Sequence, residues 1–245
     1  MLKASSKICF GIVSVFVVSL ASASNFKISE ESEALYFKAL PYLEKIDALS
    51  NSLFKARDQL PDNEIFPAQK KQQYRDEVQA ILKEALPLLK RSAEEGNPAA
   101  QYRLALISSN FESPDNVSDE KICTLLRSSL SNGFTPAGLQ MFHSCSDEVK
   151  TPRFRSLIDA LPEDKTIYKK YYPQPTMLPT CDITVDGGSH IKIVSLDEKG
   201  FRANLYMSLL VQMWTPNPKQ EQLSYLNKAA ENGCDEAVMW LNAKK

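Results

Sequence analysis

The chain has 245 residues, of which 43% are hydrophobic, enough for one large or two small domains with a continuous core. Its 29 basic and 30 acidic residues give a formal net charge of −1. This balance argues against a nucleic-acid-binding surface, which needs a clustered basic excess, so we expect no nucleic-acid partner.

The first 23 residues have the pattern of a secretory signal peptide. Lys3 and Lys7 form a basic start, residues 8–20 are an apolar run, and residues 21–23 (Ala-Ser-Ala) form a small-residue cleavage site. The apolar run is shorter than the ~20 residues that a membrane-spanning helix needs. We therefore expect a periplasmic or secreted protein that begins near Ser24 and has no membrane span after cleavage. An uncleaved anchor is the alternative.

Residues 24–81 are expected to form an N-terminal helical hairpin. Its first helix has an apolar stripe and is kinked or broken at Pro41, and its second begins at Pro67 and runs toward Gly96. The stripe consists of Leu35, Leu43, Ile46, Leu49 and Leu53.

Residues 88–104, LLKRSAEEGNPAAQYRL, read as two helices joined by a very short turn. Gly96 follows the last turn of the first helix, where a left-handed residue commonly ends a helix. Asn97 can cap the second helix, and Pro98 suits the first helical position, where its missing N–H costs nothing.

The same pattern recurs at residues 125–141 (LLRSSLSNGFTPAGLQM) and 225–241 (YLNKAAENGCDEAVMWL). Gly133 and Gly233 occupy the position of the first glycine, and the first two glycines are 37 residues apart (133 − 96). A period in this range with two helices per unit is typical of a helical solenoid.

These stretches resemble the Sel1-like repeat family, a relative of the tetratricopeptide repeats. The resemblance rests on residues 90–106 and 227–241, which contain Ala-Ala/Glu-x-Gly, then Ala, an aromatic residue and Leu. It implies an all-α solenoid of helical hairpins, with repeats at 82–150 and 201–245. The family is used largely for protein–protein contact.

Residues 151–200 are expected to be a degenerate repeat that carries a small β-hairpin insertion. Three prolines, at 173, 175 and 179, favour extended structure before it. In residues 181–196, CDITVDGGSHIKIVSL, apolar residues alternate on both sides of the turn signal at 186–189. We predict that the two halves pair as a two-stranded hairpin.

Four cysteines remain after removal of the signal peptide: Cys123, Cys145, Cys181 and Cys234. An even number in an oxidising compartment predicts disulfides, with three possible connectivities. Cys123 and Cys145 lie on either side of the Gly133 turn and face each other in an antiparallel helix pair, which leaves Cys181 with Cys234. The alternatives are four buried thiols or a metal site, and the absence of C-x-x-C spacing disfavours zinc.

The sequence indicates no catalytic residues, no cofactor and no metal ligands. His143 lies close to Cys145, but neighbouring side chains on a helix point apart, which disfavours a nucleophile–base pair. His190 lies near Asp182 and Asp186, where a polar hairpin surface is favoured over a metal site. No phosphate-binding, G-x-S-x-G or H-E-x-x-H motif occurs.

The aromatic residues divide between packing and recognition. Most are expected in the core or between repeats, with one or two as candidates for a binding groove: Tyr102, Phe142, Tyr206, Trp214 and Trp240. Exposed tyrosines in the proline-rich region would be better recognition candidates: Tyr168, Tyr171 and Tyr172.

Two classes of function remain. Export and the Sel1-like resemblance imply a non-catalytic scaffold that binds another protein, in a sharper form an immunity protein that inhibits a periplasmic toxin. The alternative is a cell-wall-ligand binder or an enzyme of the cysteine-containing Sel1-like type. The sequence assigns no residue to the partner interface.

Overall fold

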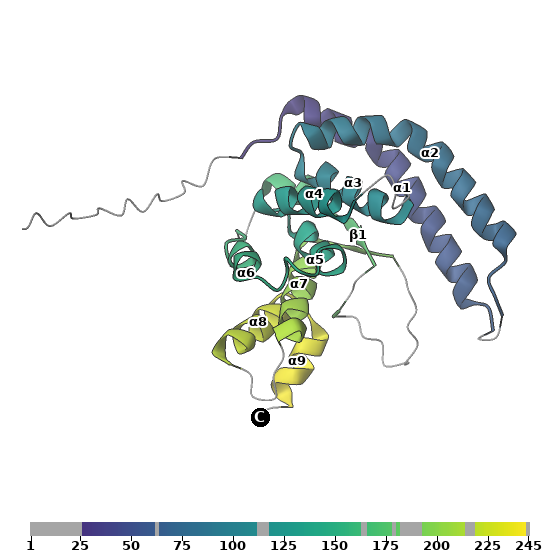
Figure 1. Cartoon of the computed structure of the whole chain (residues 1–245). Helices are drawn as coiled ribbons and strands as arrows, with labels where there is room; N and C mark the ends of the chain where they lie inside the picture. Colours follow the sequence, from purple (N-terminus) through teal and green to yellow (C-terminus); the bar gives the residue numbers. More distant parts are fainter. Residues whose placement is uncertain are drawn as a thin grey trace, which may run out of the picture.

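A computed structural model describes residues 26–61, 64–111, 118–162, 166–177, 180–181, 193–213 and 219–243. Within these ranges the chain is mostly helical, as the all-α expectation requires, with one two-stranded sheet (Figure 1). The helices are α1 (Glu30–Asp58), α2 (Ala68–Glu94), α3 (Pro98–Phe111), α4 (Asp119–Ser131), α5 (Thr135–Ser144), α6 (Pro152–Asp159), the 3-10 helix η1 (Thr166–Tyr171), α7 (Glu198–Met213), α8 (Gln220–Glu231) and α9 (Asp235–Asn242). The strands are β1 (Gln174–Thr176) and β2 (Val194–Leu196).

Helices α1 and α2 form a long antiparallel hairpin at one end of the molecule (Figure 1). The Ser29 hydroxyl caps α1 by accepting the N–H of Ser32 at 3.0 Å. Pro41 does not end α1, and Pro87 lies inside α2. A proline removes one backbone hydrogen bond, and the packing of the two helices on each other holds both together across that gap.

Three helix pairs, α2–α3, α4–α5 and α8–α9, are joined by turns of the same geometry. Gly96, Gly133 and Gly233 have φ values of 89°, 88° and 90°, the left-handed conformation that favours glycine. In each turn the residue after the glycine donates its N–H to a carbonyl five residues earlier, as Asn97 does to Ser92. The sequence therefore predicts these three turns correctly.

The helices of this series pack on one another in chain order, except that α5 packs on α7 across the intervening α6. Helix α3 contacts α2 and α4, α5 contacts α4 and α7, and α8 contacts α7 and α9. Gly138 of α5 permits a close approach, because a Cβ there would lie 3.1 Å from Ile158 of α6 and 3.2 Å from Leu205 of α7. Helix α7 is buried on every side from Phe201 to Leu210 and forms the centre of the C-terminal half.

The small sheet differs from the predicted hairpin. Strand β2 pairs antiparallel with β1, with Pro175 opposite Ser195. Residues 182–192, which include the expected first strand and turn, lie outside the described part of the chain. The described partner of β2 is thus a segment that the sequence places in the proline-rich region.

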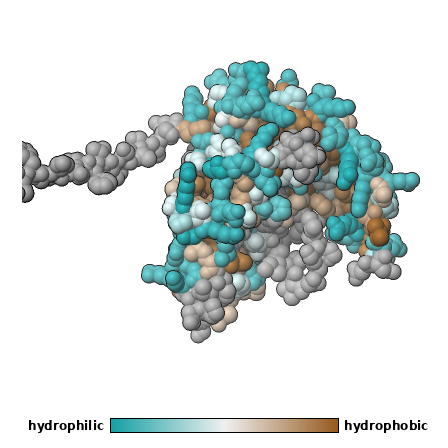
Figure 2. Space-filling view, viewed as in Figure 1, coloured by the Kyte–Doolittle hydropathy of each residue, from teal (hydrophilic) through white to brown (hydrophobic). Residues whose placement is uncertain are grey.

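Among the described residues, none of the helices combines the length and the apolar composition needed to cross a membrane. The face shown in Figure 2 is largely hydrophilic, with hydrophobic residues in small groups. The large hydrophobic side chains that are exposed in the described part are Ile65, Ile167, Val211, Val238 and Met239.

Candidate functional site

Of the two histidines, the structure describes one. His143 is exposed near the end of α5, and His190 lies outside the described residues, as does Trp214. The other helix aromatics follow the packing expectation: Tyr102 and Tyr206 are buried, and Phe142 and Trp240 are half-buried against the core.

The three tyrosines expected as exposed recognition residues are instead buried or half-buried, which corrects that interpretation. Tyr168 and Tyr171 are 1% and 3% exposed, and Tyr172 packs against the core. The Tyr171 ring stacks on Phe37 of α1 with centroids 5.4 Å apart, and the Tyr168 ring meets Phe134 edge-on at 5.4 Å. Burial raises the pKa of both phenols above its usual value.

Hydrogen bonds attach the segment from Tyr168 to Thr176 to the helices. The Tyr168 hydroxyl donates to the Asn132 carbonyl at 2.6 Å, and Tyr102 of α3 donates to the Pro175 carbonyl at 2.6 Å. Gln174 donates through Nε2 to the Tyr36 hydroxyl of α1 at 2.9 Å. The segment is therefore part of the core, and its end at β1 lies between α1 and α3.

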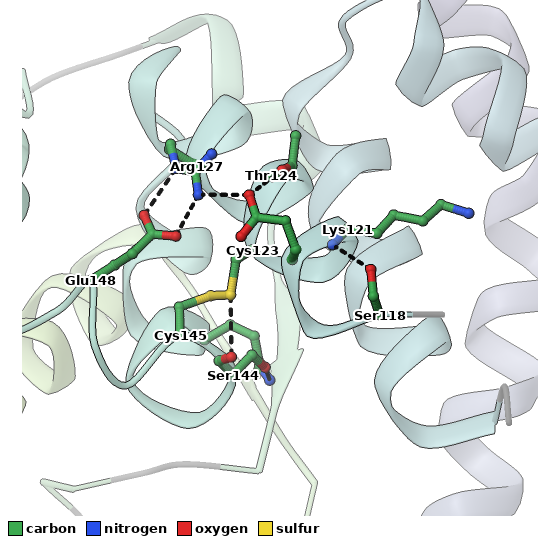
Figure 3. The surroundings of a disulfide bond; sticks show 10 residues. Ser118, Lys121, Cys123, Thr124, Arg127, Ser144, Cys145 and Glu148 are labelled. Carbon is green, nitrogen blue, oxygen red and sulfur yellow. Dashed lines mark hydrogen bonds and ion pairs between the residues drawn. A yellow bond between two sulfur atoms is a disulfide. The ribbon is translucent and has the colours of Figure 1, made fainter. Parts of the chain in front are cut away.

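Disulfides join Cys123 to Cys145 and Cys181 to Cys234, the two pairs that the sequence predicts. The Cα atoms of these pairs are 5.7 Å and 5.0 Å apart. The first bond connects the start of α4 to the end of α5 (Figure 3). Asn204 of α7 accepts the backbone N–H groups of Thr180 and Cys181, which places Cys181 against Cys234.

An ion pair lies beside the first disulfide (Figure 3). Arg127 of α4 donates through Nε to Glu148 Oε2 at 2.9 Å, and this hydrogen bond holds the pKa of the Glu148 carboxyl below its usual value. Glu148, Cys123 and Cys145 lie close enough to bind a metal ion, but the two sulfurs are bonded to each other here. The disulfide therefore removes both thiolates from such a site.

A pocket of about 220 Å³ lies between α1, α2, α3 and the start of the sheet. Most of its lining is apolar, which is typical of a ligand-binding pocket. The apolar side chains are Ile46, Leu53 and Phe54 of α1, Leu106, Ile107 and Phe111 of α3, and Pro175, Met177 and Ile193 near the strands.

One ion pair, between Arg103 of α3 and Asp47 of α1, also lines this pocket. Arg103 Nη2 donates to Asp47 Oδ1 at 2.9 Å and to the Leu43 carbonyl at 3.4 Å. The Arg103 side chain is 4% exposed and that of Asp47 is 28% exposed. Arg103 Nε is buried and has no acceptor among the described residues.

Most of the other polar groups around the pocket already have partners. The Ser50 hydroxyl bonds to the Ile46 carbonyl at 2.8 Å and to the Tyr74 hydroxyl at 2.7 Å. Asn110 donates through Nδ2 to the Leu106 carbonyl at 2.8 Å. Arg103 and Asp47 are therefore the groups best placed to contact a polar atom of a ligand.

No sequence motif marks Arg103 or Asp47. A sequence signal for Arg103 does exist, because it is the one charged residue in the otherwise uncharged stretch 98–107, PAAQYRLALI. The structure buries this helix from Pro98 to Ala105. A charged residue there needs a buried partner. The partner lies on α1, 56 residues away, and no local pattern identifies it.

Comparison of the chain with family models, with curated proteins and with solved structures finds no significant match.

Proposed function

We propose that this protein is a non-catalytic helical-repeat scaffold that binds another protein in the periplasm or outside the cell. The observation that carries this proposal is the pocket between α1, α2 and α3. It combines an apolar lining with a buried arginine whose Nε–H has no acceptor among the described residues. The apolar lining favours insertion of a side chain from a partner, and the polar pair favours recognition of its backbone.

The repeated helix pairs support the same function. Three turns with a left-handed glycine connect helices that pack in sequence, as in solenoids, whose extended surfaces bind proteins. The resemblance to Sel1-like repeats is part of this proposal and points to the same use. The signal-peptide pattern and the two disulfides favour an oxidising compartment.

The test is affinity capture of the tagged, exported protein from the periplasm of its host, followed by mass spectrometry. Leu106→Trp fills the pocket from a half-buried lining position. Leu157→Trp makes the same change at a half-buried position on α6, away from the pocket. We expect one stoichiometric protein that is retained by the wild type and by Leu157→Trp and is lost with Leu106→Trp.

Melting curves establish that both variants fold. Absence of any stoichiometric partner would refute the scaffold proposal. If both variants retain the partner, the scaffold proposal holds, but the interface lies away from the pocket. If the partner is a toxin, rescue of growth by the wild type and by Leu157→Trp but not by Leu106→Trp would support the immunity form of the function.

A further inference from the structure

The pocket places a hydrogen-bond donor and an acceptor side by side at an apolar surface. Among the described residues, Arg103 donates hydrogen bonds through Nη2 alone, and its Nε–H is buried without an acceptor. Asp47 uses Oδ1 for Arg103, and its carboxylate is partly exposed where it lines the pocket. A complementary ligand must therefore offer an acceptor to the arginine and a donor to the aspartate.

The charge of this site selects among ligands. Arg103 and Asp47 neutralise each other, so a charged ligand group would be buried without a counter-charge, which is costly. A free carboxylate would also lie next to the Asp47 carboxylate. An amide is neutral and carries an acceptor and a donor, which matches the pair without these costs.

The volume of the pocket limits the size of the apolar side chain that a ligand can place in it. An apolar cavity of ~150 Å³ is large enough to hold benzene. The pocket here has about 220 Å³, which provides room for a leucine or phenylalanine side chain and part of the adjoining backbone.

The rim of the pocket already holds extended backbone. Pro175, Thr176 and Met177 line it, and the Pro175 carbonyl accepts a hydrogen bond from a helix side chain, Tyr102. The same helix, α3, presents Arg103 one residue further along. Tyr102 is buried behind the pocket lining, and its hydrogen bond fixes the extended backbone of this rim in place.

We propose that the pocket binds a protein segment by enclosing one bulky apolar side chain, while a peptide group beside that side chain accepts a hydrogen bond from Arg103 and donates one to Asp47. This inference rests on the proposed protein-binding function and specifies its ligand chemistry. The recognised element is an uncharged stretch with a leucine-sized or phenylalanine-sized anchor.

The experiment uses the isotopically labelled mature protein and follows the Arg103 Nε–Hε signal by NMR. This signal is assigned by through-bond correlation to the Arg103 backbone. The probes are acetyl-Ala-Leu-Ala-amide, acetyl-Ala-Phe-Ala-amide, acetyl-Ala-Ala-Ala-amide and octanoate. We expect the leucine and phenylalanine peptides to shift the Arg103 signal, and the alanine peptide to bind at least about tenfold more weakly, because it buries fewer methyl and methylene groups.

Two controls connect the shift to the proposed contacts. Methylation of the peptide nitrogens beside the leucine removes the donor for Asp47 and should weaken binding. Leu106→Trp should abolish the shift, and Leu157→Trp should preserve it. Octanoate binding more tightly than the leucine peptide would show an anion site and overturn the inference, as would an Arg103 signal that no peptide shifts.

The two proposals fail separately. If capture returns a partner that Leu106→Trp retains and no peptide shifts Arg103, only this inference is wrong. If capture returns no partner, the scaffold function is wrong whatever the peptides do.

Discussion

The Tyr102 hydroxyl donates a hydrogen bond of 2.6 Å to the Pro175 carbonyl, which joins α3 to a strand 73 residues later in the chain. Tyr102 is fully buried, and burial raises the pKa of its phenol far above the usual value. The bond lies away from water, so the carbonyl has no solvent to replace Tyr102. The segment from Tyr168 to Thr176 is therefore fixed to α3 by Tyr102.

Replacing Tyr102 with Phe should lower the free energy of unfolding by about 1–3 kcal/mol, because the Pro175 carbonyl would be left buried without a donor. Urea denaturation measures this difference. Tyr42→Phe is the matched control, since Tyr42 is half-buried in α1 and makes no hydrogen bond among the described residues. Equal stabilities for the two variants would contradict a structural role for this bond.

The Gly96 turn allows a second test. A Cβ at Gly96 would have no atom within 4 Å, so only the backbone conformation disfavours a side chain there. Gly96→Ala should cost roughly 1–2 kcal/mol, the penalty of a left-handed conformation for an L-residue. Gly96→Asn should cost less, because asparagine tolerates this conformation. Thermal melts of both variants measure these losses. A Gly96→Ala variant with the melting temperature of the wild type would contradict the left-handed turn.

The features that the sequence predicts well depend on local physical chemistry. Gly96, Gly133 and Gly233 end helices because of their own backbone freedom, and Asn97 caps α3 by accepting the N–H groups of Ala99 and Ala100 at 3.0 and 3.2 Å. The disulfide between Cys123 and Cys145 follows from the same antiparallel geometry. These features involve residues close together along the chain or within one repeat.

The features that the sequence does not predict depend on contacts between distant segments. Tyr171 lies in a proline-rich stretch that favours exposure, and it is buried because Phe37, far away in α1, packs on it. Likewise β2 pairs with Gln174–Thr176, which carries no alternating pattern. The Arg103–Asp47 pair also joins two distant helices, so the candidate site became visible only in the structure.

Acid should weaken the region of the first disulfide through Glu148. Its pKa is lowered in the folded protein, mainly by the hydrogen bond from Arg127, so this stabilisation is present above the ordinary glutamate pKa and is lost as the pH falls through the folded value. Glu148→Gln should lower the melting temperature slightly at pH 7, and this deficit should shrink as the pH falls below the ordinary glutamate pKa. Asp147→Asn, at a 99% exposed side chain, is the control. A Glu148→Gln deficit that stays the same size as the pH falls would show that the ion pair is not its cause.

The signal-peptide pattern at residues 1–23 predicts that the mature protein begins near Ser24. N-terminal sequencing of the protein recovered from the periplasm or medium checks this. Replacing Ala21 and Ala23 with bulky residues should block cleavage and leave the precursor at the membrane. Recovery of the wild type at the membrane with Met1 retained would instead support the anchor alternative.

The two disulfides should make unequal contributions to stability. Cys123–Cys145 spans 22 residues and Cys181–Cys234 spans 53, so the chain-entropy model gives roughly 3 and about 4 kcal/mol, respectively. Paired replacement by serine should lower the free energy of unfolding by these amounts, with the larger loss for Cys181 and Cys234, because that bond closes the longer loop. Peptide mass mapping without reduction identifies the bonds first. Four free thiols would contradict the pairing and the oxidising compartment from which it was predicted. A peptide that joins Cys123 to Cys181 would contradict the pairing and the repeat register.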